Sequence, residues 1–230
     1  MEHAPMRTTL MARAGGLHAK QLLRSHRGRR GFSLIEVIVV VGIVALIAAI
    51  AAPAAQRAMS SYQLNLGTET VAATLGYARQ AAITMNRDVE VRLLTVAMAP
   101  NMPTVQRVRG IVLLDVGESA PRMVAIPRYL PEGIVINTNT DFSTLARLTE
   151  ETPGGTDPDL PGIGKSYKMR KFRFRPDGST NLPQLITAPG VNKYFMSLHR
   201  ETTTSATALP SNFATIQIEP ATGAVSVHRP

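Results

Sequence analysis

Apolar and polar positions divide the chain into a long helical part followed by a strand-rich part. Residues 37–56 form a run of twenty residues without a formal charge, which is long enough to cross a hydrocarbon layer of about 30 Å as one helix. From Ala54 to about Asn86, good helix formers continue without a proline. Apolar residues recur there at helical spacing and predict one buried stripe. Its members are Leu64, Val71, Leu75, Ala78, Ala82 and Met85.

Pro53 stands at the junction of these two stretches. A proline inside a helix removes one backbone hydrogen bond and clashes with the preceding turn, so a bend or local loosening is expected there. The alternative is a helix that ends at residue 52, but the helical pattern that follows argues against it. We therefore predict one long helix over residues 32–86, apolar all round in its first half and amphipathic in its second half.

The pattern changes from helical to alternating after residue 86. Val89, Val91 and Leu93 alternate with charged neighbours, which predicts a half-buried strand. Five further segments have the composition of strands. They are residues 105–116, 122–126, 133–137, 166–175 and 192–199.

A β-hairpin is predicted at the C-terminal end. The apolar residues of 214–218 alternate with polar ones, residues 220–223 form a turn, and Val225 and Val227 are expected to point inward again. Because no second long helical pattern recurs, the predicted fold class is α+β. A long N-terminal helix is expected to pack on a C-terminal antiparallel β-sheet, with two small packed sheets as the alternative.

Two segments between the predicted strands have the composition of loops. Residues 138–164 are rich in Thr, Pro, Gly and Asp and offer few apolar side chains to a core, so we expect a mobile surface loop. Residues 201–212 form a second such loop. Either loop could be displayed to a partner, and a plain connection is the simpler interpretation.

The positive charge is concentrated at the N-terminus. The net charge is +9, and residues 1–31 hold seven basic residues against one acid, so +3 is left for the rest of the chain. The overall basicity therefore does not indicate a basic folded surface. Basic residues ahead of an apolar run favour a cytoplasmic N-terminus and a C-terminal part outside. The sequence has no cysteine, which excludes disulfides and thiolate metal sites.

Basic residues followed by an apolar run are also typical of a secretory signal peptide. That interpretation fits poorly here. The apolar run exceeds the usual length of about 7–15 residues. It contains Glu36, and the small residues 48–52 that could precede a cleavage site run directly into Pro53.

Residues 29–37, which read RRGFSLIEV, resemble the prepilin motif of type IV pilins and type II secretion pseudopilins. In that family a membrane peptidase cuts after the glycine, and the new N-terminal residue, usually phenylalanine, is N-methylated. The resemblance implies cleavage after Gly31 and N-methylation of Phe32. It also matches Glu36 to the acid at the fifth mature position and Pro53 to the helix-bending proline at the twenty-second.

The resemblance gives Glu36 a role in assembly. A carboxylate in a lipid-embedded helix costs about 2.5–3.5 kcal/mol at the bilayer centre and less near the interface. The family implies that Glu36 of one subunit pairs with the amine that cleavage creates on Phe32 of its neighbour. The alternative is a carboxyl that reaches the headgroups or stays protonated.

The resemblance further implies four segments. Residues 1–31 would be a basic leader, 32–55 a transmembrane and assembly helix, 56–86 its amphipathic continuation, and 87–230 a β-rich head. The mature chain would be a structural subunit, not an enzyme, of a type II secretion or type IV pilus-like filament.

The same family implies the partners and the location. Partners would be a prepilin peptidase, other pilin or pseudopilin subunits, an inner-membrane assembly platform and the lipid bilayer. The precursor would span the inner membrane once, with a cytoplasmic N-terminus and a periplasmic head, before it enters a pilus or pseudopilus.

Within this family, the stretch from Glu69 to Arg92, with its pattern around residues 75–86, looks like the minor pseudopilin H and FimT group. So do Phe174, Pro176 and Gly178, followed by a terminal hairpin that carries Gly223. The long leader and the proportions of the chain also resemble the Verru_Chthon cassette protein D family.

A basic cluster lies on the strand predicted at residues 166–175, with aromatic residues between the charges. Basic and aromatic residues together can grip a phosphate backbone and stack on bases, but on a strand such aromatics more often face the core. FimT-type DNA-uptake pilins carry a Gly-Arg-x-Arg motif near the terminal hairpin, and residues 223–226 lack both arginines. Nucleic acid is therefore not an expected partner. The cluster consists of Lys165, Lys168, Arg170, Lys171, Arg173 and Arg175, with Tyr167, Phe172 and Phe174 interleaved.

The sequence contains no recognisable motif for phosphate binding, metal binding or nucleophilic catalysis. Residues 162–166 (GIGKS) suggest a phosphate-binding loop, but the required first glycine is Asp159 and a strand is predicted to follow. The histidines lack metal-ligand spacing, and no G-x-S-x-G nucleophile elbow occurs. No catalysis, metal or cofactor is expected. Two alternative functions stay open: an unprocessed single-pass membrane anchor carrying an extracytoplasmic binding domain, and a DNA-binding minor pilin for DNA uptake.

Overall fold

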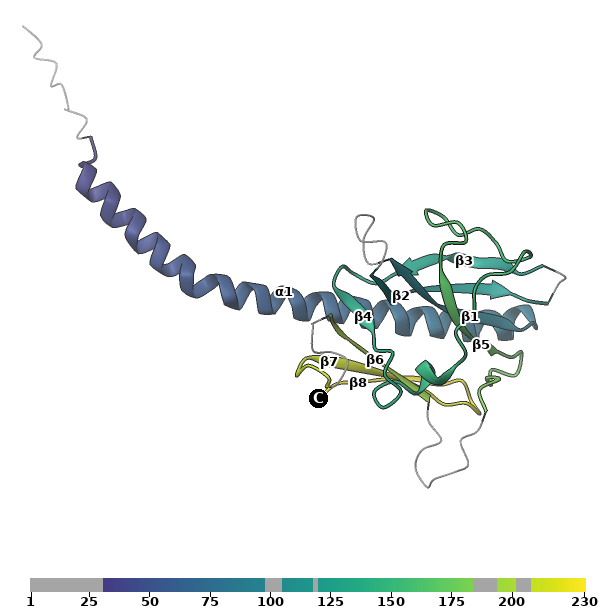
Figure 1. Cartoon of the computed structure of the whole chain (residues 1–230). Helices are drawn as coiled ribbons and strands as arrows, with labels where there is room; N and C mark the ends of the chain where they lie inside the picture. The colour runs from purple at the N-terminus through teal and green to yellow at the C-terminus, as the bar shows by residue number, and fades with distance from the viewer. Residues whose placement is uncertain (1–30, 98–104, 118–119, 184–193, 202–207) are drawn as a thin grey trace, which may run out of the picture. The chain divides into compact units, whose positions relative to one another are not determined.

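The computed structural model describes residues 31–97, 105–117, 120–183, 194–201 and 208–230 (Figure 1). The predicted leader therefore lies outside the described residues except for Gly31. Parts of the loop predicted at 201–212 and of the strand predicted at 192–199 lie outside them as well. Within the described part, one α-helix precedes eight strands and a short 3-10 helix, η1 (Thr144–Arg147).

Helix α1 (Leu34–Met85) contains Pro53 and continues past it, so the alternative of a helix end at residue 52 is wrong. The helix stops in a Schellman motif, in which the N–H groups of Asn86 and Arg87 donate to carbonyl oxygens of the last turn at 3.3 and 3.2 Å. Asn86 takes a φ of 52°, a left-handed conformation that asparagine tolerates better than most residues. This local chemistry ends the helix where the alternating pattern begins.

The strands form one antiparallel sheet (Figure 1). Their order is β5-β1-β2-β4-β6-β7-β8, and β3 pairs with β2 on the same edge as β4. Each predicted strand has a counterpart, so the α+β prediction is confirmed. The strands are β1 (Val89–Ala97), β2 (Gln106–Asp115), β3 (Arg122–Tyr129), β4 (Ile134–Ile136), β5 (Lys168–Phe174), β6 (Tyr194–Arg200), β7 (Phe213–Ile218) and β8 (Val225–His228).

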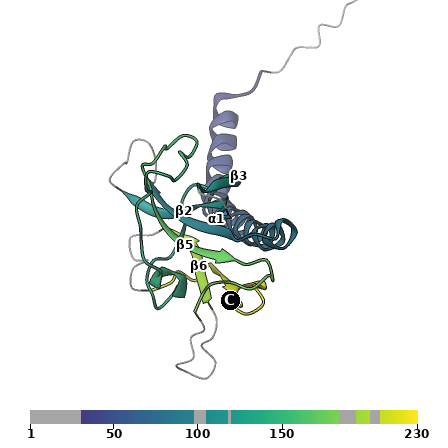
Figure 2. The ribbon, with the colours of Figure 1, turned by 90° about the vertical axis from the view of Figure 1, so that its right-hand side faces the viewer.

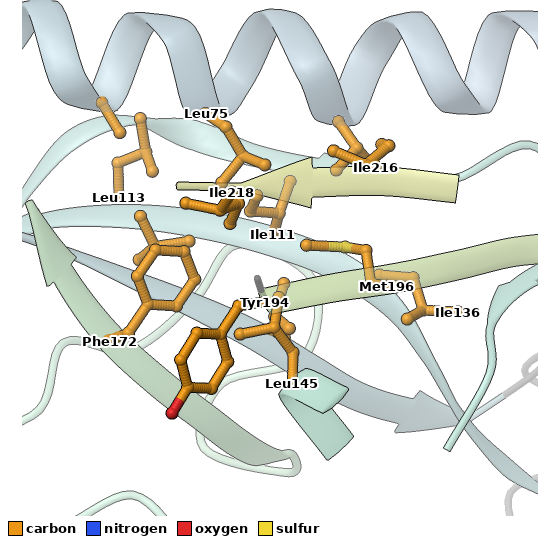
Figure 3. Packing of buried hydrophobic residues seen from close by; sticks show 14 of the residues in the cluster. Leu75, Ile111, Leu113, Ile136, Leu145, Phe172, Tyr194, Met196, Ile216 and Ile218 are labelled. Carbon is orange, nitrogen blue, oxygen red and sulfur yellow. The ribbon is translucent and has the colours of Figure 1, made fainter. Parts of the chain in front are cut away.

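The C-terminal half of α1 lies along one side of the strands (Figure 2) and supplies one wall of the main core. Figure 3 shows Leu75 of the helix above Ile111, Leu113 and Ile218 of the sheet. The predicted stripe is buried from Leu64 to Ala82, but the prediction fails at its last member. Met85 is 38% exposed, because the Schellman turn ends the helix there.

Strand β1 is buried on both faces, so the prediction of a half-buried strand is wrong. Glu90 and Arg92, which should face solvent, are 2% and 3% exposed. A second core lies on this outer face and includes Leu94 of β1.

The cover over the outer face comes from the predicted mobile loop at residues 138–164, and that prediction is corrected too. Leu145 and Leu160 of this segment are both buried. Leu145 joins the main core, and Leu160 joins the second core on the outer face. These two leucines and the backbone bridge between Glu151 and Met169 hold the segment against the sheet.

The terminal hairpin β7–β8 is confirmed, with one correction. Val225 packs against the main core, whereas Val227 is 43% exposed. Val227 stands opposite the buried Ile216 in the ladder. Because β8 is the last strand in the order of the sheet, Val227 lies at the border of the sheet.

Candidate functional site

The predicted cleavage point lies just before helix α1. Gly31, Phe32 and Ser33 precede the first helical residue and are exposed, with Phe32 at 79%. The first helical hydrogen bond runs from Val37 N to the Ser33 carbonyl oxygen at 3.1 Å. The Gly31–Phe32 peptide bond therefore stands outside the helical hydrogen-bond ladder.

Glu36 occupies the first turn of α1. A negative side chain near a helix N-terminus is favourable by about 0.3–1 kcal/mol because it meets the positive end of the helix dipole. Glu36 is exposed, and within the described part of the chain it forms no ion pair. The next charged residue along the helix is Arg57. Glu36 is thus a single acid at the start of a long uncharged surface.

The first half of α1 exposes its apolar side chains on all sides. The helix is long and apolar enough to cross a membrane, judged by length and composition, and none of the apolar stretch is buried. The large side chains of this stretch are between 49% and 79% exposed. They are Phe32, Leu34, Ile35, Val37, Ile38, Val39, Val40, Val41, Ile43, Val44, Leu46, Ile47 and Ile50. Apolar surface of this extent is typical of a site that binds a membrane or another protein.

Pro53 follows this apolar stretch and lies inside the helix. Proline has no backbone N–H, so the helix lacks one of its regular hydrogen bonds, the one that would reach the Ala49 carbonyl oxygen. The bend or local loosening expected at Pro53 stays a prediction.

The second half of α1 is fixed to two turns of the sheet domain. Arg79 Nε donates to the Thr222 carbonyl oxygen at 2.8 Å, and the Arg79 side chain also lies beside Gly178. Gly178 and Gly223 both have positive φ, at 83° and 64°, so each favours glycine. The glycines quoted for the resemblance to the H and FimT group are therefore brought together at the C-terminal part of the helix.

The basic cluster on β5 is largely neutralised by acids of the same chain. Lys168 and Arg170 contact Glu150 at 3.5 and 2.9 Å, and Lys171 contacts Glu151 at 2.6 Å. Burial raises the pKa of Glu150, but the Thr95 hydrogen bond and the charges of Arg170 and Lys168 outweigh it, so the pKa is lowered.

Of the other members of the cluster, one contacts an acid, one is held by backbone carbonyls and one is exposed. Arg173 Nε contacts Glu90 at 3.0 Å, and Lys165 Nζ donates to the carbonyl oxygens of Gly154 and Gly155 at 3.1 and 2.9 Å. Arg175 is exposed. The aromatic residues Tyr167, Phe172 and Phe174 are buried. The cluster therefore offers neither stacking faces nor a row of free cations to a phosphate backbone.

Sequence reasoning missed a buried ion-pair network on the outer face of β1. Arg92 contacts Glu90 through Nε and Asp157 through Nη2, both at 2.7 Å. Burial alone would lower the pKa of Arg92, but the two carboxylates outweigh it and raise the pKa. Burial alone would raise the pKa of Asp157. The hydrogen bond from the Gly154 N–H and the charge of Arg92 outweigh burial, so the pKa of Asp157 is lowered. The available signal was the pair of opposite charges two residues apart on one strand face.

The suspected phosphate-binding loop has another structure. Leu160 and Gly164 form a bridge, and β5 follows four residues later. The Lys165 ammonium is held by the backbone carbonyls already described. Across the residues that the structure describes, no group of three or more His, Asp or Glu side chains could hold a metal ion.

Comparison with known proteins supports the N-terminal motif. Residues 26–52 match the model of the family described as "Prokaryotic N-terminal methylation motif". No curated protein matches the sequence. The match covers the junction on which the resemblance was based, so the prediction of a type IV pilin-like N-terminal segment is confirmed. The resemblance to the Verru_Chthon cassette protein D family stays a prediction.

Two kinds of solved structure are similar to the chain. One is the minor pseudopilin EpsH from the Type 2 Secretion System of Vibrio cholerae, with 10% identity, a TM-score of 0.39, and coverage of 73% of this chain and 98% of that chain. The other is the type IV minor pilin FimU of Pseudomonas aeruginosa (strain PAO1), with 13% identity, a TM-score of 0.40, and coverage of 73% and 89%. The likeness is loose, and the N-terminal motif is the comparison that bears on function.

Proposed function

We propose that this chain is the precursor of a pilin-like subunit of a type IV pilus or type II secretion filament. A prepilin peptidase cuts after Gly31, and Phe32 is then N-methylated. The observation that carries the proposal is the match of residues 26–52 to the methylation motif, at the start of a helix that exposes an apolar first half. The second half of the same helix is built into the core of a sheet domain, as a subunit that projects from a filament requires.

The proposal divides the chain by role. Residues 1–31 are the leader that is removed, and 32–55 hold the precursor in the membrane and later contact other subunits. Residues 56–86 connect this segment to the head, residues 87–230. The basic leader favours a cytoplasmic N-terminus, which puts the head in the periplasm and the anchor in the inner membrane. The partners are the peptidase, an assembly platform in that membrane and other pilin-like subunits.

Cleavage changes the electrostatics at the start of the helix. It creates a positive amine on Phe32, one helical turn from Glu36. In a low-dielectric surrounding, an unpaired carboxylate and an unpaired amine are each costly. Pairing the amine of one subunit with Glu36 of its neighbour relieves both costs and favours assembly over separate anchored subunits.

The experiment that tests the proposal is the intact mass of the full chain, purified from cells with and without a prepilin peptidase. With the peptidase, the mass should correspond to a chain that starts at N-methylated Phe32. Without it, the mass should include residues 1–31. A full-length mass in both strains would contradict the proposal and favour the unprocessed membrane-anchored binding domain.

A further inference from the structure

A groove of about 510 Å³ lies between α1 and β3, on a part of the molecule that the proposed function does not yet use. One wall is the helix, the other wall is β3, and the floor is β2. The lining residues are Thr70, Ala73, Thr74, Tyr77, Ile111, Leu113, Ala125, Ile126 and Arg128.

The helix wall is less polar than its sequence suggests. Thr70 Oγ1 donates to the Leu66 carbonyl oxygen at 2.7 Å, and Thr74 Oγ1 donates to the Thr70 carbonyl oxygen at 2.6 Å. Both hydroxyls are thereby satisfied within the helix. Together with Ala73 they leave a wall of small side chains, which is what lets a second helix approach closely.

The β3 wall is poorly suited to bind another strand. Pro127 lies within β3 and has no N–H to donate. The pairing of β3 with β2 also contains two register irregularities, between Ile111 and Leu113 and between Leu113 and Leu114. Prolines and bulges are devices that prevent an edge strand from pairing further. An occupant of the groove is therefore better sought among helices.

An exposed stripe leads along α1 into the groove. Its large members, Met59, Tyr62 and Leu66, are 59%, 64% and 44% exposed, and Tyr77 at its far end is 51% exposed. With Thr70 and Ala73 of the groove wall, these residues recur every three or four positions, which places them on one face of the helix. The stripe consists of Met59, Tyr62, Leu66, Thr70, Ala73 and Tyr77. The stripe thus leads from the helix segment that the proposed function assigns to contacts with other subunits toward the groove.

The groove has a direction along the helix. At its N-terminal end, Gly67 approaches Leu130 and Pro131, the residues that follow β3. Near its C-terminal end, Arg87 pairs with Asp115 at the end of β2. In the pairing of β2 with β3, Arg122 stands opposite Asp115, at the C-terminal end of the groove. Arg128 stands opposite Ile111 and therefore lies toward the N-terminal end.

We propose that this groove binds the apolar helix of a second copy of the chain, parallel to α1, with Glu36 of that copy against Arg128. The inference rests on the proposed function. Arg128 is exposed and has no ion-pair partner within the described part of the chain. Glu36 is the one acid at the start of the helix, and no other charged side chain follows until Arg57. Opposite charges thus meet at the N-terminal end of the groove, and the aliphatic residues after Glu36 run along it.

This arrangement sets the stagger between the two copies. Glu36 of one copy lies level with Thr70 of the other, an offset of roughly 50 Å at 1.5 Å per residue. Such an offset can exist only after one copy has left the membrane, so the contact belongs to the assembled filament. A carboxylate has two oxygens, so Glu36 can accept from Arg128 of one neighbour and the Phe32 amine of another.

Cysteine cross-linking tests the contact, because the chain contains no cysteine of its own. Full-length Ala73→Cys is co-expressed with full-length chains carrying one cysteine at each position from 37 to 43 in turn, in cells with the peptidase. The matched control replaces Ala73→Cys by Ser166→Cys, an exposed residue that does not line the groove. After mild oxidation of sheared filaments, disulfide-linked dimers are measured.

The expected result is that Ala73→Cys forms dimers with two or three of the seven partner positions, at helical spacing, and Ser166→Cys forms none. Arg128→Ala should lower dimer formation and Arg128→Lys should keep it, with Arg175→Ala as the neutral control. Equal cross-linking from both starting positions, or none from Ala73→Cys, overturns the inference. Ala73→Cys that is shielded from alkylation in filaments without any dimer would also overturn it, since another occupant then fills the groove.

The test separates this inference from the proposed function. Chains that are cut after Gly31 and found in filaments, but that do not cross-link, leave the proposed function intact and remove only the groove contact. Chains that are never cut and never enter filaments remove both.

Discussion

Gly223 and Gly178 lie in contact at the junction of two turns, although a long stretch of chain separates them. A Cβ atom on Gly223 would overlap the carbonyl oxygen of Gly178 and stand 3.0 Å from the ring of Phe174. Gly178 in turn lies against Arg79 of α1. This contact joins the end of β5, the terminal hairpin and the helix, so it fixes how the helix sits on the sheet domain.

Replacing Gly223 should therefore destabilise the head. Gly223→Ala combines a φ of 64° with the overlap just described, and strain of this kind costs about 1–3 kcal/mol. Urea unfolding of the mature chain in detergent, followed by circular dichroism, measures the loss. Gly155→Ala is the matched control, because a Cβ there meets open space. A stability loss equal to that of the control would show that the contact is not needed.

Breaking the buried ion pairs on the outer face should be more damaging. Arg92→Met leaves Glu90 and Asp157 without their shared cation, and removal of one partner of a buried pair costs about 3–5 kcal/mol. Arg175→Met, at an exposed position, should change the free energy of unfolding by less than about 0.5 kcal/mol. The same urea measurement distinguishes the two. If both variants unfold alike, the network contributes little.

Acid should loosen the 138–164 segment. The folded-state pKa values of Glu150 and Asp157 are held below the ordinary values of 4.5 and 3.8. Carboxylates with depressed pKa values stabilise the fold above their unfolded pKa, and this stability is lost as the pH falls through the folded pKa. Unfolding measured between pH 7 and pH 3 should therefore show a decline that begins near the ordinary values.

The Glu150→Gln variant provides the control for this prediction. It should be less stable at pH 7 and should lose less on acidification than the native chain, since it has one ionisable partner fewer. A pH profile that runs parallel to the native one would mean that Glu150 does not contribute.

Changing Glu36 should separate processing from assembly. Glu36→Ala leaves Gly31 and Phe32 in place, so the chain should still be cut, as intact mass will show. Its incorporation into sheared filaments, measured by immunoblot, should fall strongly, because the Phe32 amine of a neighbour loses its partner. Glu69→Ala, which removes an exposed acid from the same helix, should assemble normally. Unimpaired assembly of Glu36→Ala would exclude the pairing.

The elements of the fold could be predicted from the sequence because local patterns carry them. The helical spacing up to Ala82 and the alternation in β7 are properties of neighbouring residues. Even the end of the helix has a local cause, since Asn86 accepts the left-handed conformation that stops it. The candidate cleavage site is local as well, and a short motif at residues 26–52 carries it.

What could not be predicted depends on residues far apart in the chain. Glu90 and Arg92 alternate with apolar residues, as residues on a solvent-facing side of a strand do. They are buried because the distant segment that carries Asp157 covers them. The groove was missed for a similar reason. Thr70 and Thr74 look polar in sequence, but their hydroxyls are bonded within the helix, and β3 brings the opposite wall.

Pro53 gains a mechanical meaning from its place in α1. The helix continues on both sides of it, so a pull along a filament would be carried by successive backbone hydrogen bonds, with one bond missing at this step. Extension should start at Pro53, on the N-terminal side of Leu64, which is the first residue of the helix in the main core. The chain could then lengthen under tension and recoil, while the sheet domain keeps its shape.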